Sequence, residues 1–301
     1  MSNALRIGII GLDTSHVTAF TQLLNDPAQT YHVPGGKVTV AFPGGSPDFE
    51  LSISRVQGFT DKLRDEHGVQ IVDSVEQVAE QSDAILLESV DGRVHLEQFA
   101  KIAPYGKPVF IDKPLAVSSE DAKQIAALAA KHGIAVMSTS ALRYAEGLSE
   151  VLGSGEKGAV IGVDAYGPMA IQPTQPGYFW YGIHTVEMVF AVLGKDCVDV
   201  TVTTNDDYDV IVGRWADGRI ATVRGNRKGN NSFGAVVHRE KGSQFVDVYS
   251  HAKPYYASLL ERIMPMFKGE GAAIDFAETI AVIRFIEAAN ESREHGNTVA
   301  L

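Results

Sequence analysis

The sequence predicts an α/β protein with an N-terminal doubly wound parallel sheet and a C-terminal α+β domain built on a large, mainly antiparallel open sheet. Strand and helix patterns alternate along the first half of the chain, which is typical of parallel pairing with right-handed crossovers. Successive strand patterns fill residues 198–249, and 301 residues are enough for two domains that each bury a core. We expect the domains to cover residues 1–141 and 142–301.

The N-terminal domain has five strand candidates, each a short apolar run, at residues 5–10, 38–42, 84–87, 109–111 and 135–137. Helical patterns lie between them at 17–24, 94–102 and 120–131. Ser118 and Ser119 offer capping side chains at the start of the last helix, and Gly133 is a typical residue just beyond its end. This part of the chain therefore predicts repeated strand–helix units.

In the C-terminal domain the pattern changes to consecutive strands. A helix near 144–152, a strand at 159–166 and a helix at 185–192 come first. Strand candidates follow at 198–204, 208–215, 219–224, 235–239 and 244–249, and Asp217-Gly218 between two of them is a strong hairpin signal. Helices near 255–266 and 276–294 complete the chain, so we expect an antiparallel sheet with helices on one face.

Composition excludes several classes of protein. The formal net charge of −11, with no strong basic stripe, argues against a nucleic-acid surface. The one cysteine, Cys197, excludes an internal disulfide, and we expect it to pack as a small apolar residue. The N-terminus has no signal-peptide pattern and no apolar run approaches membrane-spanning length, so the sequence predicts a cytoplasmic protein without membrane contact.

Chemistry in such a sheet is expected beyond the carboxyl ends of the strands, where ligands bind. The residues there are 11–16, 43–48, 88–91, 112–114 and 138–143. Lys113 is the most informative, because Pro114 restricts its backbone to an extended conformation at the end of a strand. It could act as an acid, a base or an electrostatic clamp on a substrate oxygen. The alternative is a loop lysine that extends into solvent.

A second group of candidates surrounds His184, in Tyr178-Phe-Trp-Tyr-Gly-Ile-His184. His184 is expected in the first turn of a helix, where the helix dipole favours the neutral, proton-accepting imidazole. The alternative is a structural histidine under an aromatic lid. Glu187 follows three residues later, but two ligands alone make a poor metal site, and we predict no metal.

Taken together and in order, these segments resemble the Gfo/Idh/MocA family, named for glucose–fructose oxidoreductase and inositol dehydrogenase. The motifs that carry the resemblance are I-G-I-I-G (7–11), D-A-I-L-L (83–87) leading to Val94-His95, K-P-V-F-I-D-K-P-L-A (107–116), Arg143-Tyr144, Gly182-x-His184 and the closing S-R-E-H-G-N-T-V-A-L. The family's E-K-P motif is D-K-P in this chain. The resemblance covers nearly the whole sequence.

The resemblance implies a Rossmann dinucleotide-binding domain (1–141), a substrate-binding and oligomerisation domain (142–301), and NAD(P)-dependent oxidation of a sugar, polyol or similar hydroxylated small molecule. Lys113 would orient the substrate oxygen and His184 would exchange its proton. Substrate-binding residues would be Arg143, Tyr166, Trp180 and Tyr181. Cofactor-binding residues would be Gly11, Leu12, Asp13, Thr14, Ser15, Ser89, Val90, Asp91, His95, Asp112 and Lys113. NAD and NADP are both left open, and a homo-oligomer formed through the C-terminal sheet is expected.

Three further departures from the family pattern matter. Asp13 and His16 stand where the fingerprint G-x-G-x-x-G has glycines, and the Asp13 carboxylate would repel phosphates unless it turns back to cap the helix. Trp180 replaces the aspartate of D-x-G-x-H. The strand at 38–42 runs into Pro43 without the acid that receives the adenosine ribose, although Asp48 could reach it.

These departures leave a second hypothesis open. The chain could be a cofactor-free member of the family, acting as a sugar-binding or regulatory protein, or as a lyase that uses Lys113 and His184 for acid–base elimination. Asp13, Trp180 and the missing ribose acid together motivate this alternative.

Overall fold

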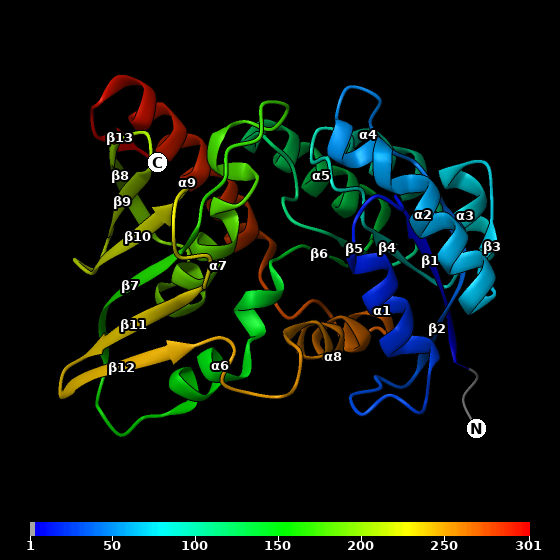
Figure 1. Cartoon of the computed structure of the whole chain (residues 1–301), viewed down its shortest axis with the longest axis horizontal. Helices are drawn as coiled ribbons and strands as arrows, with labels where there is room; N and C mark the ends of the chain where they lie inside the picture. Colours follow the sequence, from blue (N-terminus) through cyan, green and yellow to red (C-terminus); the bar gives the residue numbers. More distant parts are fainter. Residues whose placement is uncertain (1–3) are drawn as a thin grey trace. The chain divides into compact units, whose positions relative to one another are not determined.

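A computed structural model describes residues 4–301 of the chain (Figure 1). The chain forms two compact units, each described by itself. The first comprises the chain up to Ala116 together with Glu120–Thr139 and Tyr256–Phe276, and the second comprises Val117–Ser119, Ser140–Tyr255 and Ala277–Leu301. The domain limits predicted from the sequence, 1–141 and 142–301, stay a prediction. The two compact units divide the chain differently, since residues 256–276 belong to the first unit.

The first unit is built on a six-stranded parallel sheet in the order β3-β2-β1-β4-β5-β6. Its strands are β1 (Leu5–Ile10), β2 (Gly36–Phe42), β3 (Gln70–Ile71), β4 (Ala84–Leu87), β5 (Val109–Ile111) and β6 (Val136–Met137). β4 and β5 are buried along their whole lengths, as expected of central strands covered on both faces. The predicted doubly wound sheet is confirmed. The strand order reverses at β1, because β2 and β3 lie on one side of it and β4, β5 and β6 lie on the other.

Helices alternate with these strands along the first unit (Figure 1). They are α1 (His16–Asn25), α2 (Glu50–His67), α3 (Val75–Gln81), α4 (His95–Ile102), the short 3₁₀ helix η1 (Ala103–Tyr105) and α5 (Ser119–His132), whose first residue belongs to the second unit. The helix α8 (Tyr255–Phe267) also packs here over most of its length: a Cβ on Gly36 would meet the Met264 methyl carbon at 3.0 Å. Gly133 ends α5 in the left-handed conformation, as predicted.

The second unit contains a seven-stranded, mostly antiparallel sheet in the order β12-β11-β7-β10-β9-β8-β13. Its strands are β7 (Val160–Pro168), β8 (Cys197–Thr204), β9 (Tyr208–Trp215), β10 (Ile220–Asn226), β11 (Gly234–Arg239), β12 (Gly242–Asp247) and β13 (Val299–Ala300). Only β7 and β10 pair in parallel. This confirms the predicted open sheet.

One face of this sheet packs on helices of the same unit: α6 (Glu146–Gly153), α7 (Gly182–Leu193) and α9 (Phe276–His295), with the 3₁₀ turns η2 (Ala141–Tyr144) and η3 (Gly177–Phe179) between elements. α7 lies so close to β7 that a Cβ on Gly167 would meet Thr185 Cγ2 at 2.9 Å. Phe190, Trp215 and Phe285 fill the core with rings 5.6–6.4 Å apart. The helices therefore cover one face and leave the other open.

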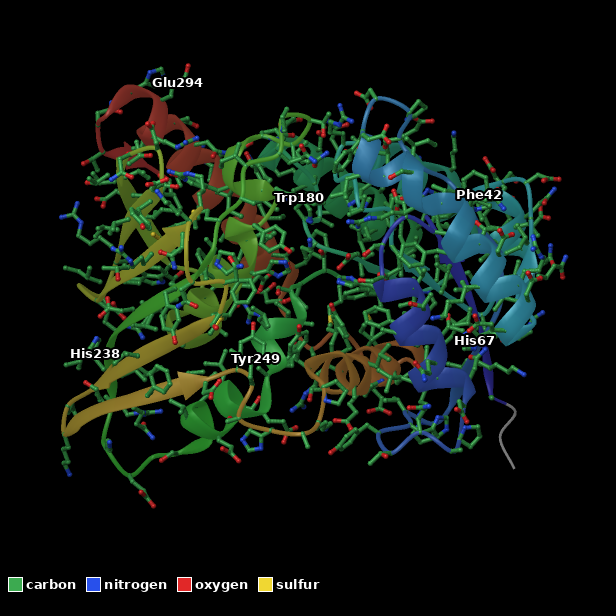
Figure 2. All side chains as sticks on the ribbon, viewed as in Figure 1. Phe42, His67, Trp180, His238, Tyr249 and Glu294 are labelled. Atoms are coloured by element: carbon green, nitrogen blue, oxygen red, sulfur yellow. The ribbon has the colours of Figure 1, made fainter. Side chains whose placement is uncertain are left out.

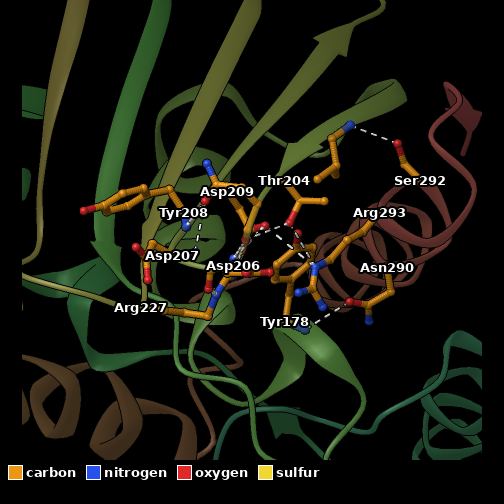
Figure 3. A network of polar contacts seen from close by, with 12 residues as sticks. Tyr178, Thr204, Asp206, Asp207, Tyr208, Asp209, Arg227, Asn290, Ser292 and Arg293 are labelled. Carbon is orange, nitrogen blue, oxygen red and sulfur yellow. Dashed lines mark hydrogen bonds and ion pairs between the residues drawn. The ribbon is translucent and has the colours of Figure 1, made fainter.

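A buried ionic network ties the strands of this sheet to α9 (Figure 3). Asp209, on β9, pairs with Arg227 just beyond β10 and lies 3.7 Å from the Arg293 Nε of α9. The Arg293 guanidinium also lies over the Tyr178 ring, 5.6 Å from its centroid, and the Tyr178 N–H donates to Asn290 Oδ1 at 3.0 Å. Because Asp209 is completely buried, its charge needs these arginines, and the network fixes the end of the sheet.

Cys197 lies at the start of β8 and packs as a buried residue, as the sequence predicts. Burial raises the pKa of its thiol to about 12. We therefore expect a thiol reagent such as Ellman's to leave the native protein unmodified at pH near 8 and to titrate one thiol after unfolding in guanidinium. Rapid reaction of the native protein would show that the start of β8 opens to solvent.

No helix of the described chain combines the length and the apolar character that crossing a membrane requires.

Candidate functional site

The turn after β1 is closed by contacts with the loop after β2. Gly11 has φ 89°, the left-handed region that favours glycine, and a Cβ there would lie 2.5 Å from the Ser89 backbone. The Gly11 N–H donates to the Phe42 carbonyl at 3.0 Å, and the Leu12 N–H donates to the Pro43 carbonyl at 2.6 Å. The first fingerprint glycine is thus required where the ends of β1, β2 and β4 approach one another. Ser15 follows as the N-cap of α1.

The Asp13 carboxylate faces the protein interior and is only 1% exposed. The Ser52 hydroxyl of α2 donates to its Oδ2 at 2.5 Å, and the Val90 N–H donates to its Oδ1 at 3.0 Å. Burial raises the pKa of this carboxyl, although these hydrogen bonds oppose the shift. The capping role considered for Asp13 is wrong, because the N-cap of α1 is Ser15, whose side chain makes no cap hydrogen bond. The carboxylate therefore does not stand where a phosphate would lie.

Replacing Asp13 with asparagine tests this orientation. We expect Asp13→Asn to lose about 1–3 kcal/mol of unfolding free energy, because an amide cannot accept both hydrogen bonds and brings a buried donor. Its affinity for NADH should change little, since the side chain faces away from the phosphate position. Urea denaturation and fluorescence titration measure the two quantities. Binding that tightens tenfold or more in Asp13→Asn would show that the carboxylate repels the ligand.

Arg93 holds the carboxylate that the sequence suggested for a ribose. Its guanidinium donates two hydrogen bonds of 2.8 Å to Asp48, from the loop after β2, and others to Asp91, from the loop after β4. Arg93 lowers the pKa of Asp48 through these hydrogen bonds. Asp48 can therefore receive a ribose hydroxyl only by giving up this ion pair, and β2 itself ends without an acid.

His95 fixes two loops at the same edge of the sheet. It is completely buried, with Nε2 2.7 Å from the Ser89 carbonyl and Nδ1 2.9 Å from the Pro114 carbonyl. The Ser89 hydroxyl donates to Gln98 Oε1 of α4 at 2.9 Å. These contacts occupy both ring nitrogens of His95. Its predicted cofactor contact stays a prediction, and its observed contacts position the residues around Lys113.

Four ionisable residues gather beyond the ends of β1, β4 and β5: His16, Glu88, Asp112 and Lys113. We call them the His16 cluster. His16 Nδ1 lies 2.9 Å from Asp112 Oδ2 and 3.8 Å from Glu88 Oε2. Glu88, Asp112 and Lys113 are buried, whereas His16 is partly exposed. The predicted placement of Asp112 and Lys113 at the carboxyl edge of the sheet is confirmed.

Burial and mutual charge set the protonation of this cluster. Burial raises the pKa of Glu88 well above its ordinary range, and repulsion from Asp112 and Asp13 adds to the effect. Burial alone would also raise the pKa of Asp112, but the His16 ring, with Nδ1 2.9 Å from Asp112 Oδ2, and the charge of Lys113 hold it low. Burial lowers the pKa of Lys113, against the attraction of Asp112 and Glu88. Shifts of this kind are typical of functional sites.

In the second unit, His184 lies in the first turn of α7 within an aromatic group. Its Nδ1 is 2.7 Å from Ser140 Oγ, and the rings of Tyr181 and Phe233 lie edge-on at 5.6 and 5.5 Å. Trp180 is buried beside Tyr181, with ring centroids 6.1 Å apart, and is labelled in Figure 2. A neutral His184 whose Nδ1–H donates to Ser140 would present Nε2 as the proton acceptor.

Arg143 is held in ion pairs, and Tyr166 lies on the face of the sheet that the helices leave open. Arg143 donates from Nε to Glu187 Oε2 at 2.9 Å and also pairs with Glu278 of α9, so Glu187 is an ion-pair partner. Tyr166 lies on β7, where Val163 and Ala165 are buried on the helix side and Tyr166 alternates to the other face. The structure therefore does not bring Tyr166 together with His184, although the sequence grouped them.

Sequence reasoning missed Ser52, Arg93, Glu278 and the role of Glu88. Ser52 and Glu278 lie on helices far along the chain from their partners, so no local pattern could connect them. Arg93 had a signal, since it stands two residues after Asp91 in a strand-end loop. Glu88 had a clear sequence signal, because it directly follows a fully buried strand. A carboxylate at such a position must be paired or functional.

Residues 5–140 match the model of a protein family described as an oxidoreductase family with an NAD-binding Rossmann fold, GFO_IDH_MocA. A comparison with curated proteins found no significant match.

Several solved structures share the fold over almost the whole chain. One is myo-inositol 2-dehydrogenase from Lactobacillus plantarum (TM-score 0.80, 16% identity, 99% of this chain and 100% of that chain). Another is myo-inositol dehydrogenase from Lactobacillus casei, solved with NAD(H) and myo-inositol (TM-score 0.76, 17% identity, 99% and 97%). A third is scyllo-inositol dehydrogenase from Lactobacillus casei, with NAD(H) and scyllo-inositol (TM-score 0.80, 14% identity, 99% and 99%).

The carboxyl edge of the first sheet keeps several features that a dinucleotide requires. Gly11 keeps the required turn, Asp13 faces inward, and Ser15 is exposed at the start of α1, where helix amides and the helix dipole favour a phosphate. No free carboxylate follows β2 to receive the adenosine ribose, since Asp48 is paired with Arg93. The residues therefore fit the pyrophosphate of a dinucleotide better than its ribose. Residues 5–140 are thus similar to the NAD-binding Rossmann domain of the Gfo/Idh/MocA oxidoreductase family.

Proposed function

We propose that the protein is an NAD(P)-dependent oxidoreductase that transfers hydride to or from a sugar, polyol or related hydroxylated small molecule. The observation that carries the proposal is the buried Lys113 beside Asp112 and Glu88, at the carboxyl edge of a sheet whose family binds NAD. A buried lysine between carboxylates is costly to maintain without a function. The inositol dehydrogenases with the same fold act on polyols, which supports this substrate class.

The residues around the β1 turn would hold the cofactor. Gly11 and Leu12 form the turn, and the amides and side chains of Thr14 and Ser15 at the start of α1 would receive the pyrophosphate. Ser89, Val90 and Asp91 would border the nicotinamide side of the edge. The bound dinucleotide supplies the hydride acceptor or donor, while the protein supplies position and field.

Lys113 would orient the substrate oxygen, and its ammonium would stabilise negative charge that develops there during oxidation of an alcohol. His184 would accept the hydroxyl proton on Nε2, with Ser140 holding the ring through Nδ1. Trp180 and Tyr181 would offer flat apolar faces to a sugar-like ring, and Trp180 brings one N–H donor in place of the family aspartate.

A panel of sugars, inositols and other polyols tests the proposal, with NAD⁺ or NADP⁺ and absorbance of the reduced nicotinamide as the readout. We expect at least one compound to be oxidised, with the activity reduced by about 10²–10⁴ in His184→Ala. Activity that survives both His184→Ala and Lys113→Met unchanged would contradict the catalytic roles. A panel with no activity in either direction would contradict the substrate class.

The cofactor-free alternative has lost part of its support. Its first motive was a carboxylate facing the phosphates, whereas Asp13 faces Ser52 and Val90. The other two observations that motivate it remain: Trp180 in place of the family aspartate, and the missing acid for the ribose. Mass spectrometry of protein purified without added cofactor distinguishes the two hypotheses, because a retained dinucleotide would exclude the alternative.

We also propose that the chain forms a homo-oligomer through the open face of the seven-stranded sheet. Ile220, Val212 and Phe245 are 52%, 37% and 62% exposed and alternate with buried neighbours, which places them on the face away from α7. An apolar open face of this kind favours pairing with a second copy.

Light scattering during size exclusion tests this surface. We expect a mass of at least two chains for the parent protein and a smaller mass for Ile220→Asp. Ile53→Asp is the matched control, since Ile53 is 40% exposed on α2 in the other unit and should leave the mass unchanged. A monomeric parent protein, or an unchanged mass in Ile220→Asp, would contradict the proposed surface.

A further inference from the structure

Glu88 is the least satisfied buried group at the carboxyl edge of the first sheet. Its side chain is 0% exposed, and neither carboxylate oxygen has a hydrogen-bond partner within residues 4–301. A buried carboxyl group without hydrogen-bond partners is destabilising, whether its charge is kept or a proton is taken up. A proton would not satisfy it, because His16 Nδ1, at 3.8 Å, is too distant for a hydrogen bond.

Two other ligand-type side chains converge on the same point. One ligand atom from each of His16, Glu88 and Asp112 lies within 4.8 Å of the other two. A metal held at roughly 2.1 Å by three tetrahedral ligands keeps the ligand atoms roughly 3.4 Å apart. The distances from His16 Nδ1, 2.9 Å to Asp112 and 3.8 Å to Glu88, lie on either side of that value. Shifts of a few tenths of an ångström would bring these contacts to coordination distance.

The three side chains stand on rigid backbone. The Glu88 N–H donates to the Ile10 carbonyl at 2.7 Å, and the Asp112 N–H donates to the Leu87 carbonyl at 2.8 Å, so both carboxylates extend from the sheet itself. The His16 ring stacks on Phe20 with centroids 5.6 Å apart and packs against Tyr256 at 5.0 Å. Such support keeps the ligands close together before an ion arrives, which lowers the cost of binding.

Charge also favours a cation at this point. Metal binding removes any proton that Glu88 or Asp112 holds, and the charge of the cation would offset the repulsion between the two carboxylates. His16 and Asp112 are, moreover, two of the positions at which the sequence departs from its family pattern: a histidine in place of glycine and an aspartate in the D-K-P motif. Both departures bring a ligand-type side chain to the same small volume.

We propose that His16, Glu88 and Asp112 bind one divalent transition-metal cation, with Zn²⁺ as the first candidate. One imidazole and two carboxylates suit Zn²⁺, and Mn²⁺ less tightly. Three protein ligands leave a coordination position open, which a hydroxyl or carbonyl oxygen of a small molecule can take. The sequence-based expectation of no metal concerned His184 and Glu187, which are not part of this site.

The test is a titration of the full-length, tag-free protein, freed of metal by a chelator, with Zn²⁺ in competition with a chromophoric indicator. We expect one equivalent to bind, and His16→Ala and Glu88→Gln each to weaken binding by at least about 100-fold. His238→Ala is the matched control: His238 and Asp164 form an exposed pair on the second sheet, Nε2 to Oδ2 2.8 Å, and its loss should not change the affinity. Binding below stoichiometry, or binding unchanged in Glu88→Gln, would overturn the proposal.

Thermal unfolding gives a second readout and also checks that each variant folds. Glu88→Gln keeps the shape of the side chain and removes the buried carboxyl group that is repelled by Asp112, so its Tm without metal should equal or exceed that of the parent protein. Added Zn²⁺ should raise the Tm of the parent and leave Glu88→Gln unchanged. Equal rises in both would overturn the proposal. Because no dinucleotide is present in either experiment, metal binding and cofactor binding can fail separately.

Discussion

Lys113→Met is expected to reduce kcat/KM for the best polyol substrate by about 10²–10⁴, because the substrate oxygen would lose the positive charge that orients and stabilises it. Methionine preserves the length and most of the volume of the lysine side chain. NADH affinity should change far less than the rate, since the proposed pyrophosphate contacts come from the start of α1. Steady-state kinetics with NADH titration on the same preparation measures both.

Stability needs its own control in this experiment. Removing Lys113 leaves Asp112 and Glu88 buried together without their cation, which we expect to cost about 3–5 kcal/mol of unfolding free energy. Adding Glu88→Gln to Lys113→Met should recover most of that loss while the rate stays low. If the double variant recovers the rate as well, Lys113 is a structural charge and the proposed catalytic role is wrong.

Arg143→Met is expected to destabilise the second unit by about 3–5 kcal/mol. Arg143 is nearly buried and pairs with both Glu187 and Glu278, so the variant leaves two carboxylates without their partner. Urea denaturation, followed by tryptophan fluorescence, measures the change. The sequence predicted Arg143 as a substrate-binding residue, and that stays a prediction. The structure adds that the side chain joins η2 to α7 and α9.

Arg219→Met is the matched control for this variant. Arg219 pairs with the exposed Asp217 beside its hairpin, and we expect a loss below about 1 kcal/mol. Replacing Glu187 and Glu278 by glutamine together with Arg143→Met should restore part of the stability, because no charge is then left unpaired. A loss in Arg143→Met no larger than that in Arg219→Met would refute the structural role. A rise in KM without a loss of stability would instead favour substrate binding.

The parts of the fold that the sequence predicts most accurately are those where burial alone determines the pattern. β1, β4 and β5 begin and end at the predicted residues, since each is an apolar run that the sheet buries. α2 was missed because only three of its 18 residues are buried, which leaves almost no apolar periodicity to detect. β3 has two residues and is too short to leave a signal.

The site was predictable only as far as its local motifs reach. The edge of the sheet and the position of Lys113 follow from strand ends, but the direction of the Asp13 side chain depends on Ser52, from a helix that the sequence did not reveal. Similarly, strand alternation moves Tyr166 to the face opposite α7, and no motif encodes which face a strand presents. Contacts between distant segments decided each of these outcomes.

The central claim is that the turn Gly11-Leu12-Asp13-Thr14-Ser15-His16 still receives a dinucleotide. A titration of the purified protein with NADH and with NADPH, followed by nicotinamide fluorescence, tests it most directly. We expect saturable binding of at least one of the two at sub-millimolar concentration, and the preferred one identifies the cofactor. No binding of either at that concentration would contradict the account, whatever activity the protein shows by other assays.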